Sequence, residues 1–194
     1  MPLNLAAAPW LRRPLAGLCL LLGRNAAALA WLDAWPAASP EPLPARMLAQ
    51  RAWLRAQCGR LQAARDDYGR LLTGRPDDAP AWFNLGFVCD RQGDDAAALA
   101  AFQRAVALDA RLDRAWYGAG LVLMRHRRWG EAAAAFERCA ALQPLAPHAW
   151  VQLARVHQQG QRPDEVRRIV EHLSGFEPAA ARRLAAETGC TVAA

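Results

Sequence analysis

The sequence predicts an all-α fold, a solenoid of antiparallel helical hairpins that repeat every 34 residues. Trp82, Trp116 and Trp150 follow one another at that interval, and similar side chains recur around each of them. Alanine is abundant and β-branched residues are scarce, with Ile169 the only isoleucine, a composition that favours helices over strands. A fixed period in this range is typical of stacked supersecondary units.

Each tryptophan opens one copy of a two-helix pattern. In the first helix, characteristic side chains fall at positions i, i+3, i+4 and i+7, which share one face of an α-helix. The three copies of this stripe are Trp82, Leu85, Gly86 and Cys89; Trp116, Ala119, Gly120 and Leu123; and Trp150, Leu153, Ala154 and His157. We expect the tryptophan to fill the gap that glycine or alanine leaves on the neighbouring turn. The second helix pairs a small residue with a larger one a turn later: Ala98 and Phe102, Ala132 and Phe136, Val166 and Val170.

These strings closely resemble the tetratricopeptide repeat. The resemblance implies units of two helices, A and B, stacked into a right-handed α-solenoid whose concave side is lined by the A helices. We expect four repeats, over residues 45–78, 79–112, 113–146 and 147–180. The first departs from the family pattern, because Leu48 takes the tryptophan place and Arg51 the leucine place. How this repeat packs against the preceding segment is left open.

The two ends of the chain complete the predicted organisation. Residues 1–44 fit a degenerate helical repeat with a proline-rich linker, carried by Leu15, Ala16, Cys19, Gly23, Ala28, Leu32, Trp35 and Pro40. Arg12 and Arg13 before the apolar run Leu15 to Gly23 also suit a signal peptide, but Arg24 stands where a cleavage site should follow. We favour the repeat. Residues 181–194 are expected to form a C-terminal capping helix, ended by Gly189, and a tail.

Charge and chemistry exclude several functions. The net charge of +6 comes entirely from arginines, which suggests a GC-rich bacterial genome. Runs such as Arg65, Asp66, Asp67 and Arg70 indicate a solvated helix face, so we expect no nucleic-acid partner. The five cysteines and four histidines lack metal-ligand spacing, and Cys19, Cys89 and Cys139 are expected to be buried. No catalytic motif is present, so we expect no enzyme activity, metal or other cofactor.

The candidate binding residues lie on the A helices, away from the packing stripe. Positions one, five and eight residues after the first tryptophan point well away from this stripe, and the resemblance implies that they face the concave side. They predict an aromatic floor with arginines at its rim, including Arg46, and such residues are common in interface hot spots. The predicted site is Trp53, Phe83, Asn84, Phe87, Arg91, Arg114, Tyr117, Leu121, Met124, Arg125 and Arg155. Alternatively, superhelical curvature or a folded-back terminus covers the rings. If they are open, Phe83, Phe87 and Tyr117 should add little to stability.

These observations predict a non-enzymatic protein-binding module, a cytoplasmic adaptor or chaperone without a membrane span. The alternative is an exported envelope scaffold or assembly factor for a secretion, pilus or cytochrome-maturation machine, periplasmic if residues 1–35 act as a signal peptide. Some family members clamp an acidic C-terminus with Lys and Asn. Asn84 matches, but Phe83 and Phe87 beside it favour a hydrophobic or amphipathic segment with some acidic character.

Overall fold

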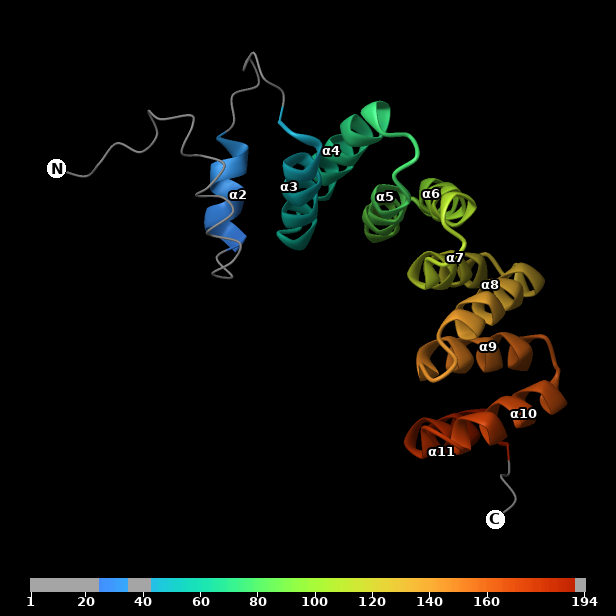
Figure 1. Cartoon of the computed structure of the whole chain (residues 1–194). Coiled ribbons are helices and arrows are strands. Elements are labelled where there is room, and N and C mark those ends of the chain that lie inside the picture. Colours follow the sequence, from blue (N-terminus) through green and yellow to red (C-terminus); the bar gives the residue numbers. More distant parts are fainter. Residues whose placement is uncertain (1–24, 35–42, 191–194) are drawn as a thin grey trace. The chain divides into compact units, whose positions relative to one another are not determined.

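The computed structural model describes residues 25–34 and 43–190, and this part of the chain contains ten α-helices and no strand (Figure 1). The all-α helical repeat fold predicted from the sequence is therefore confirmed. The chain divides into two compact units, residues 1–92 (unit 1) and 93–194 (unit 2), with the boundary in a turn between two helices.

Unit 1 contains α2 (Asn25–Asp33), α3 (Ala45–Gln57), α4 (Leu61–Gly74) and α5 (Ala79–Gln92). Helices α3 and α4 form a hairpin, and α5 packs against both. Ala28 and Leu32 of α2 are buried beside Leu54 of α3. The remaining residues of that predicted repeat, and the candidate signal segment, lie outside the described residues.

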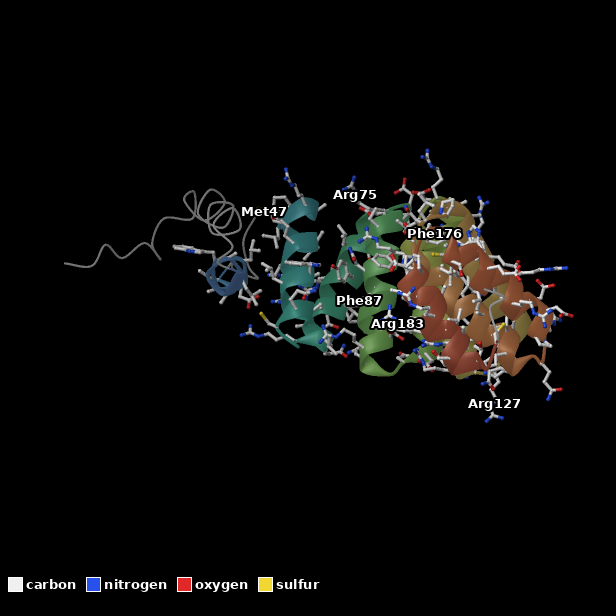
Figure 2. The ribbon with its side chains drawn as sticks, turned by 90° about the horizontal axis from the view of Figure 1, so that it is seen from below. Met47, Arg75, Phe87, Arg127, Phe176 and Arg183 are labelled. Carbon is white, nitrogen blue, oxygen red and sulfur yellow. The ribbon has the colours of Figure 1, made fainter. Side chains whose placement is uncertain are left out.

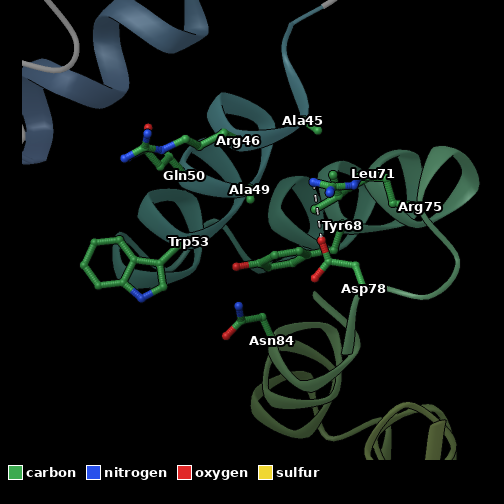
Figure 3. Close-up of a pocket in the computed structure, with 10 residues that line it drawn as sticks. All are labelled: Ala45, Arg46, Ala49, Gln50, Trp53, Tyr68, Leu71, Arg75, Asp78 and Asn84. Atoms are coloured by element: carbon green, nitrogen blue, oxygen red, sulfur yellow. Dashed lines mark ion pairs between the residues drawn. The ribbon is translucent and has the colours of Figure 1, made fainter. Parts of the chain in front are cut away.

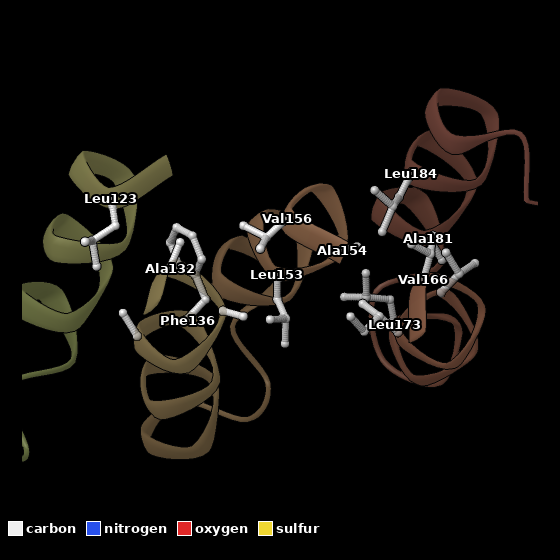
Figure 4. Packing of buried hydrophobic residues seen from close by; sticks show 14 residues of the cluster. Leu123, Ala132, Phe136, Leu153, Ala154, Val156, Val166, Leu173, Ala181 and Leu184 are labelled. Atoms are coloured by element: carbon white, nitrogen blue, oxygen red, sulfur yellow. The ribbon is translucent and has the colours of Figure 1, made fainter. Parts of the chain in front are cut away.

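Unit 2 contains α6 (Asp95–Leu108), α7 (Asp113–Arg125), α8 (Trp129–Leu142), α9 (Pro147–Gln159), α10 (Pro163–Ser174) and α11 (Pro178–Thr188). Its core joins side chains from α7 to α11, among them Leu123, Phe136 and Leu153 (Figure 4). Helix α11 packs on α9 and α10, begins within the repeat predicted over 147–180, and ends at Gly189 with a left-handed φ of 68°.

The repeat tryptophans hold the start of each A helix to the link that precedes it. The indole Nε1 of Trp116 donates a hydrogen bond to the carbonyl of Ala110 at 3.0 Å. Trp82 and Trp150 make the equivalent bond to Pro76 and Pro144, both at 2.9 Å. Three side chains thus fix three links in the same way.

A glycine on helix A makes room for the aromatic ring of helix B, and this corrects the role expected for the tryptophan. A Cβ added to Gly120 would lie 2.7 Å from the ring of Phe136, so only glycine allows this approach without a shift. Phe136 is fully buried in that position. The space beside Gly120 is therefore occupied by Phe136 from α8.

The turn that follows helix A places one residue in the left-handed region in all four repeats. These residues, 34 positions apart, are Gly59 (φ 76°), Gly93 (78°), Arg127 (57°) and Gln161 (55°). After α7 the amide of Arg128 donates to the carbonyl of Leu123 at 3.0 Å, the bond of a Schellman motif. A side chain with a Cβ is strained there, so Arg127, which extends into solvent (Figure 2), occupies a position that favours glycine.

A buried ion pair connects the two helices of the first repeat, and neighbouring charges link them to the preceding helix α2. Arg51 is only 8% exposed, and its Nε and Nη2 donate to the two carboxylate oxygens of Asp67, both at 2.8 Å. Asp67 is 1% exposed, so its assignment to a solvated face was wrong. Arg55 bridges Asp67 at 2.6 Å and Asp33 of α2 at 2.7 Å. The ion pairs therefore connect α2, α3 and α4.

The other repeats fill the same two positions with apolar residues. The counterparts of Arg51 and Asp67 are Leu85 and Ala101, Ala119 and Ala135, and Leu153 and Ile169. A buried ion pair pays a desolvation cost that its attraction only partly repays, whereas losing one partner leaves an unpaired buried charge. Arg51 gains one further contact, since its Nη1 lies 3.4 Å from the carbonyl of Leu32 at the end of α2.

His157 is a titratable residue in the core stripe of α9, where the preceding repeat has Leu123. The side chain is 7% exposed, and burial lowers its pKa. Arg162 acts in the same direction, while Glu165 and Glu137 oppose the shift. The neutral imidazole is therefore the form that the folded protein favours.

The ion pair predicts a non-additive double mutant. Asp67→Ala should lower the free energy of unfolding by about 3–5 kcal/mol, because Arg51 is left buried without its partner. Arg51→Leu with Asp67→Ala reproduces the apolar pair of the next repeat and should recover most of the loss, while Arg55 keeps Asp33. Urea unfolding followed by circular dichroism measures both. A double variant no more stable than Asp67→Ala would contradict this account.

The left-handed turn predicts a stabilising substitution. Arg127→Gly should raise the free energy of unfolding by about 0.5–1 kcal/mol, since relief of the Cβ strain outweighs the added entropy of glycine in the unfolded chain. Arg127→Ala is the matched control, because it removes the side chain and keeps the strain. Melting temperatures distinguish them: an equal gain for both variants would mean that the backbone is not strained.

His157 predicts a pH-dependent stability. The unfolded chain binds a proton near the ordinary histidine value of about 6.5, whereas the folded protein resists it, so the free energy of unfolding should fall as the pH drops below that value. His157→Leu removes this difference. Between about pH 8 and pH 5, the melting temperature of the parent should therefore fall more than that of the variant. Parallel curves would show that His157 does not titrate abnormally.

Candidate functional site

Unit 1 contains a groove of about 480 Å³ bounded by α3, α4 and α5 (Figure 3). It opens on helices A of the first two repeats. Its lining residues are Ala45, Arg46, Ala49, Gln50 and Trp53 from α3, Tyr68 and Leu71 from α4, Arg75 and Asp78 from the link, and Asn84 from α5. The volume is in the range of sites that hold ligands, and a mostly apolar lining with a few polar groups is typical of them.

The spacing of residues on α3 creates the floor and one wall of the groove. Ala45, Ala49 and Trp53 are four residues apart, so they share one face of the helix. The two alanines leave space, and Trp53 beside them is 44% exposed. An indole exposed at the edge of a hollow is well placed to anchor a partner.

Besides Arg46 and Gln50 of α3, the groove has polar groups from α4, the link and α5. Tyr68 is 1% exposed, and burial raises the pKa of its hydroxyl well above the ordinary value, with the charge of Asp67 adding to the shift. The hydroxyl therefore stays protonated. Asn84 is half-buried beside it, and Arg75 lies 3.8 Å from Asp78 (dashed in Figure 3).

Five of the predicted site residues lie in unit 1, and two of them line the groove. Trp53 and Asn84 are lining residues, whereas Phe83 is half-buried and Phe87 is 39% exposed outside the lining. The Arg91 guanidinium lies 5.8 Å from the centre of the Phe87 ring and donates to the carbonyl of Ala56 at 2.8 Å. Arg91 thus caps the C-terminal end of α3.

The predicted apolar residues of unit 2 are packed against its core. Tyr117, Leu121 and Met124 are half-buried and contact the cluster around Phe136. The Tyr117 ring meets Phe136 edge-on, with 5.6 Å between centroids. Gln152 donates to its hydroxyl at 3.4 Å. The expectation that Tyr117 adds little to stability is therefore wrong, because its ring fills space between successive hairpins.

Two predicted rim arginines of unit 2 are engaged in exposed ion pairs. Arg125 pairs with Asp95 at 2.6 Å, and Arg155 with Glu187 at 2.8 Å. These hydrogen bonds hold the pKa of each carboxyl group below its ordinary value. The third, Arg114, is exposed. Exposed pairs contribute little to stability, so Arg125 and Arg155 could exchange partners at small cost.

The described residues show no arrangement typical of a metal site. Within 25–34 and 43–190, no three His, Cys, Asp or Glu residues gather in a way that could hold a metal ion. Cys89 and Cys139 are buried, as predicted, and burial raises the pKa of the Cys139 thiol to about 11. None of the described helices combines the length and apolar character needed to cross a membrane.

Tyr68 was not predicted as a groove residue, because its ring takes the helix B packing position that Phe102 and Phe136 occupy in later repeats. The sequence signal that could have identified Tyr68 is its hydroxyl group, because Phe102 and Phe136 occupy the same repeat position and carry no hydroxyl.

Comparison with known proteins supports the repeat assignment. The tetratricopeptide repeat model matches residues 79–111 and a second such model matches residues 117–165, whereas no curated protein sequence matches. A solved structure of MamA is 17% identical over 96% of this chain and 98% of its own, with a TM-score of 0.78. MamA from Desulfovibrio magneticus is 22% identical over 92% and 96%, with a TM-score of 0.73.

YrrB, described as a TPR protein with an unusual peptide-binding site, is 19% identical over 87% of each chain, with a TM-score of 0.72. At identities this low, the likeness to these structures shows a shared fold and nothing further. The family assignment rests on the two repeat-model matches, which fall on helices α5 to α9. Residues 79–111 and 117–165 of this chain accordingly belong to the tetratricopeptide repeat family, whose repeats serve as protein-interaction modules.

Proposed function

We propose that this chain is a non-enzymatic module that holds a segment of a partner protein in the groove of unit 1. The observation that carries the proposal is the hollow between α3, α4 and α5, with Trp53 exposed at its wall. Peptide binding by YrrB, which has the same fold, is consistent with this role.

The groove suits an apolar segment with some acidic character. Ala45, Ala49 and Leu71 offer an apolar floor, and Arg46 and Arg75 place positive charge at the lining. Aromatic and arginine side chains supply much of the binding energy at protein interfaces. Phe87, exposed beside Arg91, could extend the contact along α5.

We propose the role of cytoplasmic adaptor or chaperone over that of an exported scaffold. The supporting observation is the packing of α2, whose Asp33 pairs with Arg55 and whose Leu32 is buried. A segment that contributes to the core is poorly suited to removal with a signal peptide. Mass spectrometry of the protein from its native cells tests this, because a mature chain lacking residues 1–35 would favour export.

Truncating the groove wall should weaken binding without unfolding the protein. A displayed peptide library selected on the full chain provides the ligand. Trp53→Ala should then lower affinity by about 2 kcal/mol, roughly thirtyfold, with little change in melting temperature because 44% of the residue is already exposed to solvent. Tyr117→Ala should do the reverse, lowering the melting temperature and leaving affinity of the folded fraction intact.

Leu145→Ala is the matched control, since Leu145 is apolar, 74% exposed and far along the chain from the groove residues. It should change neither quantity. Selected peptides that bind Trp53→Ala as tightly as the parent would remove the groove from consideration.

A further inference from the structure

The hydroxyl of Tyr68 is an addition to the repeat pattern that packing does not require. Phe102 and Phe136 occupy the same repeat position, are buried to the same degree and carry no polar atom. Tyr68 is 1% exposed, yet within the described residues its hydroxyl makes no hydrogen bond. A buried hydroxyl without a partner is unfavourable, so its presence needs another explanation.

The hydroxyl points into the groove. Figure 3 shows the oxygen of Tyr68 directed toward Trp53 and Asn84, while the ring lies beneath the helix that bears Ala49. Ala45 and Ala49, both small, line the same groove as Tyr68. The groove thus combines an apolar floor with one buried donor at its inner end.

We propose that this groove recognises an acidic side chain next to an apolar one in an extended partner segment, with the carboxylate accepting a hydrogen bond from the Tyr68 hydroxyl. The apolar side chain lies on Ala45, Ala49 and Leu71. This inference rests on the proposed function and specifies its ligand. A volume of about 480 Å³ accommodates more than one side chain.

Charge favours an acidic group over a neutral or basic one. Of the charged lining residues, Arg46 and Arg75 are positive and Asp78 is negative. Arg75 is partly satisfied by Asp78, whereas Arg46 is exposed and makes no ion pair among the described residues. Asn84 offers amide hydrogens beside the hydroxyl. A carboxylate would accept hydrogen bonds from these donors, and charge-assisted bonds are the stronger kind.

Short acetylated and amidated peptides test the proposal in matched sets, with Leu followed by Glu, Gln or Lys. Binding to the ¹⁵N-labelled full chain is followed at the indole N–H signal of Trp53, assigned with Trp53→Phe. The Leu–Glu peptide should bind best. Tyr68→Phe should weaken it roughly tenfold or more, because a hydrogen bond to a charged group is lost.

The same variant has a second, opposite readout. If the hydroxyl is unpartnered in the free protein, Tyr68→Phe should leave the melting temperature unchanged or raise it. Arg46→Gln should weaken Leu–Glu binding and reduce its salt dependence. Arg70→Gln, an exposed arginine of α4 outside the lining, is the control and should have no effect.

The contrary outcomes separate this inference from the proposed function. Loss of binding in Trp53→Ala but not in Tyr68→Phe, or equal affinity for Glu, Gln and Lys peptides, would overturn the inference and keep the groove. A lower melting temperature in Tyr68→Phe with unchanged affinity would assign the hydroxyl a structural role. Failure of every peptide to shift the Trp53 signal would overturn both the inference and the proposed function. A small molecule that is released when the protein is denatured would also overturn both, because the groove would then hold that molecule and not a peptide.

Discussion

The contact between an aromatic ring of helix B and a glycine of helix A is the constraint from which the repeat follows. Phe136 lies so close to α7 that a Cβ at Gly120 would be 2.7 Å from the ring, and Phe102 approaches Gly118 of the same helix equally closely. Helix α7 is therefore held between two rings, which fixes its distance from α6 and α8. The two positions of α7 that face these rings leave no room for a side chain, so only the remaining faces of this helix are free to acquire a binding function. In unit 1, Tyr68 takes the ring position and also lines the groove.

The features that recur with the period were accessible from the sequence, because each is a local requirement met in every copy. Helix positions, the buried stripes and the Gly189 stop are of this kind. Two recurrent features were less visible. The Trp116 indole bonds to a link carbonyl, which no side-chain pattern reveals. The left-handed residue is glycine at position 93 but arginine at 127, since another residue can occupy the conformation at a moderate cost.

Features that break the pattern could not be interpreted one residue at a time. Arg51 in a packing position appeared only as a departure from the family, and Asp67 appeared as part of a solvated charge run. Their spacing of 16 residues places them on different helices, where opposite charges at two packing positions of one repeat compensate each other. Considered as a pair, they were predictable. Trp53 and Asn84, which helix geometry alone directs away from the packing stripe, do line the groove. The packing of Tyr117 depends on the neighbouring hairpin, which a single-helix argument omits.

The ion pairs and the groove occupy different sides of the same helix. Arg51 and Arg55 fix α3 to α2 and α4, while Ala45, Ala49 and Trp53 face the groove. A groove wall held in this way loses little freedom when a ligand binds, and binding energy is then not consumed in ordering the helix. The buried charges that replace the apolar pair of the other repeats are thus compatible with a role in orienting the groove wall. Directional hydrogen bonds set the orientation of α3 more narrowly than apolar contacts would.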